Sequence, residues 1–150
     1  MPQHFLDSSA LLKRYREEVG SQWMLELSNN SDRIIVARLA HVEVTAAVVR
    51  RSREASESSQ NAVLALAALD GDMRNEFQVV EFSEALISRA IQLAKAHALR
   101  AADAIQLACG LVAQSALPAA TEFYFVSADE QLNVAAIAEG LRVENPNLYP

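Results

Sequence analysis

The chain has 150 residues, of which 51% are hydrophobic and 21% charged, so it is not a disordered protein, and we expect one globular domain over residues 1–150. Its formal net charge of −6 argues against a general nucleic-acid binder, which usually has a basic surface. The single cysteine forms no internal disulfide, and no apolar run approaches the ~20 residues that span a bilayer, so we expect a cytoplasmic protein without a membrane anchor.

The N-terminal part begins with a short apolar run that predicts a strand ending at about Asp7. Ser8 or Ser9 then offers an N-cap for a helix that continues through Arg16. A second amphipathic helix is expected after Gly20.

The middle of the chain has a strand pattern at 33–36 and a helical pattern from about 39 to 53. Residues 52–60 are rich in Ser and Glu and lack large apolar side chains, which predicts a break between two helices. The helix after this break is expected to end near Gly71 or somewhat later.

The C-terminal half repeats the alternation of strands and helices. The predicted elements, in order, are a strand at 77–82, a helix capped by Ser83, a helix at 100–114, a strand at 122–126, a helix at 129–139 closed by Gly140, and a strand at 141–143. Such alternation predicts an α/β three-layer sandwich, with a mainly parallel sheet of four to five strands flanked by helices.

Four acidic residues stand at unusual places. Asp7 directly follows a predicted strand and Asp129 comes two residues after another, while Glu43 and Asp103 interrupt apolar helical patterns. Ligands of open parallel sheets bind at the carboxyl ends of the strands, so Asp7 and Asp129 should share that edge. Carboxylates are rarely buried without compensation, and four of them without a His or Cys pattern suit Mg²⁺ or Mn²⁺. We therefore predict a divalent metal site.

Each of the two acids that follow strands also has a structural explanation. Asp7 could simply cap the next helix, although two serines already supply caps there. Asp129 could be a favourable first-turn charge inside a capping box with Ser127 as N-cap and Glu130 at the N3 position.

The two acids within helical patterns have alternatives as well. Glu43 could face solvent, but Val42 and Val44 beside it make a polar face awkward. Asp103 is a poor residue for a helix interior, and it could form a structural ion pair with Arg100.

Basic residues form two groups, at 13–16 and 50–53. Arg50 lies two helical turns after Glu43 on the same helix face and could reach a phosphate beyond a bound metal. Lys13 and Arg14 are further candidates for phosphate contacts. The alternative for both groups is a solvated helix face.

Several short motifs, in this order, resemble the PIN-domain proteins, and specifically the VapC-type toxins of bacterial and archaeal toxin–antitoxin pairs. The opening motif is FLDSSALLK at 5–13, and the later ones lie at 42–43, 102–108, 125–132 and 138–146. The resemblance covers essentially the whole chain. One departure is that relatives often carry Ser or Thr near the second acid, where this chain has Ala37 and Ala40.

The resemblance implies a helix-flanked parallel sheet that carries a metal-dependent ribonuclease site. It assigns the four acids of the family to Asp7, Glu43, Asp103 and Asp129, and the hydroxyl residues that line such a site to Ser8, Ser9 and Ser127. It also implies a homodimer and a cognate antitoxin, whose C-terminal segment wraps the toxin and can place a basic side chain at the acidic pocket.

The sequence thus leads to the hypothesis of an Mg²⁺- or Mn²⁺-dependent endoribonuclease that acts as the toxin of a toxin–antitoxin pair. An alternative is a catalytically silent module that uses the same pocket to hold a basic partner peptide. A third is a phosphatase with an aspartyl nucleophile at Asp7, but such enzymes usually need a second Asp where Ser9 stands.

Overall fold

The computed structural model describes residues 1–54 and 59–150, and the centre of the predicted break between two helices, 55–58, lies outside the described residues. The strands are β1 Gln3–Leu6, β2 Arg33–Ala37, β3 Gln78–Val80, β4 Phe123–Val126 and β5 Val143–Glu144. The helices are α1 Ser8–Leu12, α2 Ser21–Asn29, α3 Arg38–Glu54, α4 Ser59–Asn75, α5 Glu84–His97, α6 Ala101–Ser115 and α7 Glu130–Ala138, followed by the short 3₁₀ helix η1 Pro146–Leu148.

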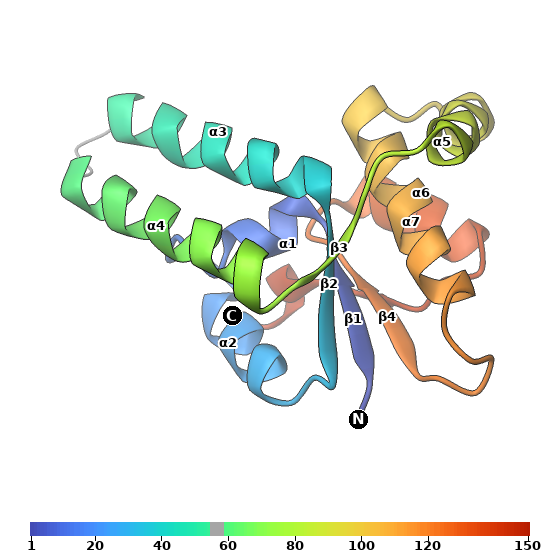
Figure 1. Cartoon of the computed structure of the whole chain (residues 1–150), viewed down its shortest axis with the longest axis horizontal. Coiled ribbons are helices and arrows are strands. Elements are labelled where there is room, and N and C mark those ends of the chain that lie inside the picture. The colour runs from blue at the N-terminus through green and yellow to red at the C-terminus, as the bar shows by residue number, and fades with distance from the viewer. Residues whose placement is uncertain (55–58) are drawn as a thin grey trace.

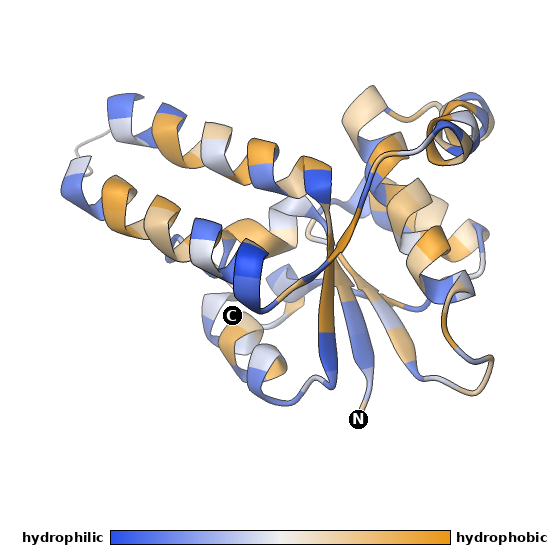
Figure 2. Cartoon of the chain, viewed as in Figure 1, coloured by the Kyte–Doolittle hydropathy of each residue, from blue (hydrophilic) through white to orange (hydrophobic). Residues whose placement is uncertain are grey.

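The five strands form one sheet in the order β3-β2-β1-β4-β5, and every pair is parallel. Strand β1 lies at the centre, where Phe5 has Ile35 on one side and Phe125 on the other. Strands β1 and β2 begin with hydrophilic residues and continue with hydrophobic ones (Figure 2). The apolar halves are buried on both faces, as a parallel sheet requires.

Helices cover both faces of this sheet (Figure 1). Successive side chains of a strand point to opposite faces. Phe5 therefore joins the core under α5, α6 and α7, while Leu6 joins the core under α1, α2, α3 and α4. The predicted three-layer α/β architecture with a parallel sheet is confirmed.

Helix α6 approaches the sheet closely because a glycine faces it. A Cβ added at Gly110 would lie 2.7 Å from Cδ2 of Phe125, a distance at which something must shift. The helix runs against the strand direction, so its N-terminal turn, with Asp103, comes to the carboxyl edge of the sheet.

Helix α1 is shorter than predicted, since it ends at Leu12 rather than continuing through Arg16. The backbone N–H groups of residues 13–15 bond to carbonyls three residues earlier, which tightens the last turn and ends the helix. The outer strands β3 and β5 are also shorter than their apolar runs suggested.

Candidate active site

The four predicted acids line one pocket of about 240 Å³ at the carboxyl edge of the sheet. Its lining residues are Asp7, Ser8, Ser9, Leu12, Glu43, Val44, Ala47, Arg50, Asp103 and Asp129. Four elements far apart in sequence contribute these acids: β1–α1, α3, α6 and the β4–α7 connection.

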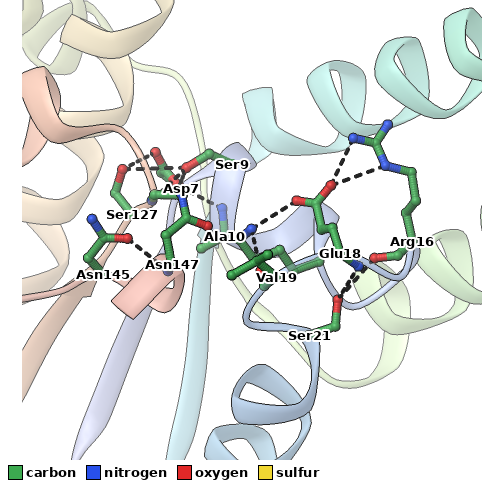
Figure 3. A network of polar contacts seen from close by, with 12 residues as sticks. Asp7, Ser9, Ala10, Arg16, Glu18, Val19, Ser21, Ser127, Asn145 and Asn147 are labelled. Atoms are coloured by element: carbon green, nitrogen blue, oxygen red, sulfur yellow. Dashed lines mark hydrogen bonds and ion pairs between the residues drawn. The ribbon is translucent and has the colours of Figure 1, made fainter. Parts of the chain in front are cut away.

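Asp7 is buried, and both of its carboxylate oxygens are held by hydrogen bonds (Figure 3). Oδ1 accepts from the Ser9 hydroxyl at 2.6 Å and from the Ala10 backbone N–H at 2.9 Å. Oδ2 accepts from the Ser127 hydroxyl at 2.7 Å. Asp7, and not a serine, is therefore the N-cap of α1, which corrects the predicted cap at Ser8 or Ser9.

The two serine hydroxyls connect Asp7 to the backbone after β4. Ser9 Oγ accepts from the Ala128 N–H at 2.9 Å, and Ser127 Oγ accepts from the Asp129 N–H at 3.1 Å. Each hydroxyl is thus oriented by a backbone donor while its own proton points at Asp7. The third predicted serine, Ser8, lines the pocket.

Asp129 begins helix α7. Its Oδ1 accepts from the Leu132 N–H at 3.0 Å, which makes Asp129 the N-cap. The predicted capping box with Ser127 as the cap and Glu130 at N3 is therefore wrong. The Ser127 hydroxyl is used for Asp7 instead, and the chain becomes helical only after Asp129.

Glu43 is held by a side chain that the sequence reasoning missed. Its Oε1 accepts from Nε2 of Gln106, a fully buried residue of α6, at 2.7 Å. A polar residue three positions after Asp103 in an apolar helix was the available signal. The neighbour Val42, which suggested an apolar surrounding for Glu43, is 66% exposed.

Asp103 lies in the first turn of α6 and not in its interior, so its helix position is favourable. This corrects the predicted conflict between Asp103 and the helix. Partial burial raises the pKa of Asp103, and the charges of Asp129 and Glu43 raise it further, against an opposing effect of Arg100.

Burial also raises the pKa of Asp7, to about 6, with a smaller contribution from the charge of Glu43. The hydrogen bonds from Ser9, Ser127 and the Ala10 N–H act in the opposite direction. A shifted pKa at a carboxylate pocket is typical of a functional site.

Oxygen ligands from four carboxylates have the chemistry that Mg²⁺ or Mn²⁺ prefers. Across residues 1–54 and 59–150, however, no group of three His, Cys, Asp or Glu side chains stands in an arrangement that could hold a metal ion. The chemistry of the four carboxylates fits a divalent ion, although their spacing does not provide direct coordination.

The three predicted phosphate contacts lie in different surroundings. Arg50 is exposed and lines the acidic pocket. Lys13 is only 5% exposed, and its ammonium donates to Glu18 Oε1 at 3.0 Å and to the Val19 carbonyl at 2.7 Å. These contacts give Lys13 a structural role in the loop before α2, and its phosphate contact stays an untested prediction.

Arg14 also has structural partners. It donates to Ser28 and pairs with Asp72, and its guanidinium lies over the ring of Phe77. We therefore keep only Arg50 as a candidate phosphate contact.

A parallel three-layer α/β fold with a four-carboxylate pocket at the carboxyl edge defines the class of protein. Residues 4–138 match the family model described as the PIN domain. The chain belongs to the PIN-domain family, as its motifs indicated.

Two curated relatives are similar over their full length. Ribonuclease VapC45 and Ribonuclease VapC49, from two strains of Mycobacterium tuberculosis, are each 35% identical over 154 residues, which cover 100% of both chains. Solved structures share the fold at lower identity. A FitAB complex bound to a DNA fragment has a TM-score of 0.67 at 16% identity, over 95% of this chain and 94% of that one. A toxin–antitoxin complex from Klebsiella pneumoniae has a TM-score of 0.60 at 16% identity, over 95% and 97%.

Proposed function

We propose that this protein is a metal-dependent endoribonuclease and the toxin of a toxin–antitoxin pair. The observation that carries the proposal is the convergence of Asp7, Glu43, Asp103 and Asp129 on one pocket from four separate elements. The names of the two full-length relatives support RNA as the substrate.

In this proposal Asp7, Asp103 and Asp129 hold Mg²⁺ or Mn²⁺, and Glu43 is a further ligand or orients the attacking water. A bound divalent ion lowers the pKa of water and offsets charge that develops on the phosphate. Asp7 Oδ2 accepts one hydrogen bond and Oδ1 two, so Oδ2 is the oxygen with a free lone pair for an ion.

The other residues of the pocket position groups. The hydroxyls of Ser9 and Ser127 fix the orientation of the Asp7 carboxylate, because each donates to a different one of its oxygens. Arg50 supplies a positive charge at the rim of an otherwise acidic pocket and would bind an RNA phosphate next to the scissile one.

The partner in this proposal is a cognate antitoxin, as in the Klebsiella pneumoniae toxin–antitoxin complex. A hollow of about 530 Å³ offers it a docking surface. Arg14, Tyr15 and Arg16 form one side of the hollow, and Leu64 and Ala68 of α4 are on the other. An antitoxin segment with apolar side chains would complement the apolar side of this hollow.

The direct test is to incubate the purified protein with total RNA in the presence of Mn²⁺ or EDTA, alongside Asp103→Asn. Asp32→Asn is the matched control, because it makes the same change on an exposed residue before β2, at the opposite edge of the sheet. We expect discrete fragments that require Mn²⁺, persist in the control and disappear in Asp103→Asn. Fragments that persist in EDTA would contradict the proposal.

The same variants separate the proposal from a silent module that holds a basic peptide. Such a module would cleave nothing under any of these conditions. It would still bind a Lys- and Arg-rich peptide, and Asp103→Asn would weaken that binding.

Divalent ions should also stabilise the folded protein, since binding relieves repulsion among the acids. A ligand at 100 times its Kd adds about 2.7 kcal/mol to the free energy of unfolding. We expect millimolar Mn²⁺ to raise the Tm of the wild type and not that of Asp103→Asn, measured by differential scanning fluorimetry. An unchanged wild-type Tm would count against a metal site.

A further inference from the structure

Gln106 occupies a position where an amide is costly. It is fully buried in α6, next to Leu107 and Ala108, which are also fully buried. Its Nε2 donates to Glu43 Oε1, but its Oε1 has no hydrogen-bond partner among the residues that the structure describes. A buried polar oxygen without a partner destabilises a fold, and an apolar side chain of similar size would avoid this cost.

The single hydrogen bond that Gln106 makes joins two elements of the pocket. Glu43 lies on α3 and Gln106 on α6, and they are 63 positions apart in the sequence. Asp103, one helical turn before Gln106, lines the same pocket as Glu43. The amide therefore ties Glu43 to the helix that carries another of the acids.

Glu43 needs such a tie because its neighbours repel it. The charge of Glu43 acts on both Asp7 and Asp103. A flexible Glu side chain relieves repulsion by turning towards solvent, and holding it in place also costs side-chain entropy. A buried N–H donor opposes both effects, and it binds Oε1 of Glu43 and not Oε2.

We propose that Gln106 is a positioning residue for the divalent ion: its amide holds the Glu43 carboxylate in the pocket at the expense of fold stability. This inference rests on the proposed metal site and deepens it. Because the amide favours metal binding and disfavours folding, its removal should weaken the affinity for the ion without lowering the stability of the fold.

The test is Gln106→Met, which keeps the length of the side chain and removes the donor and the unpaired oxygen. We expect the Kd for Mn²⁺, from isothermal titration calorimetry without RNA, to rise about 10- to 100-fold, the range for residues that orient metal ligands. The Tm in EDTA should stay the same or rise. If the Tm falls and the Kd does not change, Gln106 is a packing residue and the inference is overturned.

Gln3→Met is the matched control. Gln3 begins β1, at the opposite edge of the sheet from the pocket, and its Oε1 is also buried without a partner among the described residues. The substitution Gln3→Met should leave the Kd for Mn²⁺ unchanged. A rise in Kd equal to that of Gln106→Met would overturn the inference.

A double-mutant cycle tests whether Gln106 acts through Glu43. We expect Glu43→Ala and Glu43→Ala/Gln106→Met to bind Mn²⁺ equally, because the second change removes a donor whose acceptor is already gone. Additive losses would overturn the inference.

Two further results keep the test decisive. If Gln106→Met does not fold, Gln106→Asn retracts the amide by one methylene, and it should weaken Mn²⁺ binding by a similar factor. If the wild type binds no Mn²⁺, the metal site itself is overturned. If the wild type and Gln106→Met bind Mn²⁺ with the same Kd, only the role of Gln106 is overturned.

Discussion

The carboxylate of Asp7 has two roles, one in capping helix α1 and one in the acidic pocket. As the N-cap of α1 it accepts the Ala10 N–H, and as a pocket acid it must present charge to an ion. Only 3% of Asp7 is exposed, so the loss of hydration disfavours its charged form and raises its pKa to about 6. The two serine hydroxyls limit this rise.

The raised pKa of Asp7 predicts how stability depends on pH without metal. The folded protein binds a proton at Asp7 more tightly than the unfolded chain, whose Asp7 has the ordinary pKa of 3.8. The stabilisation from this proton is therefore complete below pH 3.8 and is lost as the pH rises through about 6. The loss is on the order of 3 kcal/mol.

Asp7→Asn should remove this dependence, because the amide does not titrate. In EDTA we expect the variant to gain stability relative to the wild type as the pH rises from 4 to 7, measured by urea unfolding. Asp32→Asn, an exposed change, serves as the control. Parallel curves for Asp7→Asn and the wild type would show that Asp7 titrates normally.

The sequence was sufficient to predict the four acids but not their hydrogen bonds. Asp and Ser are about equally good N-caps, so the cap of α1 depends on where β1 ends, and this is decided by pairing with the neighbouring strands. The bond between Ser127 and Asp7 spans 120 positions, and no local pattern indicates it. Gln106 stood out as a polar residue in an apolar helix, but its partner Glu43, 63 positions away, was not indicated by any local pattern.

At the scale of elements, helix N-termini gather around the pocket. Asp129 caps α7, and Asp103 lies in the first turn of α6. The backbone N–H groups at such ends carry partial positive charge, which offsets part of the repulsion among the acids. The parallel sheet produces this arrangement, since α7 begins where β4 finishes and α6 runs back towards the start of β4, so that both helices begin at the carboxyl edge.

The loop between α1 and α2 depends on Lys13. Replacing it with Met removes both hydrogen bonds of the ammonium, to Glu18 and to the Val19 carbonyl, and should reduce the free energy of unfolding by about 1–3 kcal/mol. Cleavage per folded molecule should stay unchanged. Urea unfolding and an RNA-cleavage assay check the two parts.

Arg50→Met is the complementary change. Arg50 is exposed, so stability should change by less than about 0.5 kcal/mol. Its loss should raise the KM for RNA and make cleavage less sensitive to salt, because one phosphate contact is gone. If Lys13→Met alters the KM and Arg50→Met does not, our assignment of the two residues is reversed.

Two glycines in helices should respond in opposite ways to alanine. Gly110→Ala places a Cβ against Phe125 and should destabilise by about 1–3 kcal/mol. Gly71 in α4 has nothing within 4 Å of an added Cβ, so Gly71→Ala should stabilise by about 0.5–1 kcal/mol. Thermal unfolding of both variants checks this, and equal effects would mean that α6 moves away from the sheet without cost.

The order and type of the elements were predictable because strand and helix periodicities alternate clearly. The residues at which the strands and helices end were less predictable. The apolar run at 77–82 exceeds β3, whose length is set by three paired residues of β2. A sheet partner, and not the run itself, determines where an edge strand stops.

At the scale of the whole molecule, no helix within the described residues combines the length and apolarity needed to cross a membrane. Large apolar side chains are nevertheless exposed on and before α5: Phe82 by 49%, Ile87 by 37% and Ile91 by 52%. Exposed apolar groups of this kind mark interaction surfaces. We use them to test the homodimer that the family resemblance implies.

We expect the wild type to elute as a dimer in size-exclusion chromatography with light scattering, and Ile91→Glu to shift it towards the monomer because a charge would be buried in the interface. Leu25→Glu, at an apolar residue of α2 that is 48% exposed, is the control and should leave the dimer intact. A monomeric wild type would exclude this interface.

The central strand has a consequence for synthesis of the protein. β1 is made first, but one of its two neighbours is β4, which lies near the other end of the chain. Asp7 acquires its Ser127 partner, and the pocket its fourth acid, only after the ribosome has passed Asp129. A truncated or still-growing chain therefore contains three of the acids without the strand that aligns them. The pocket of a growing chain is therefore incomplete until the residues of β4 and Asp129 have been added.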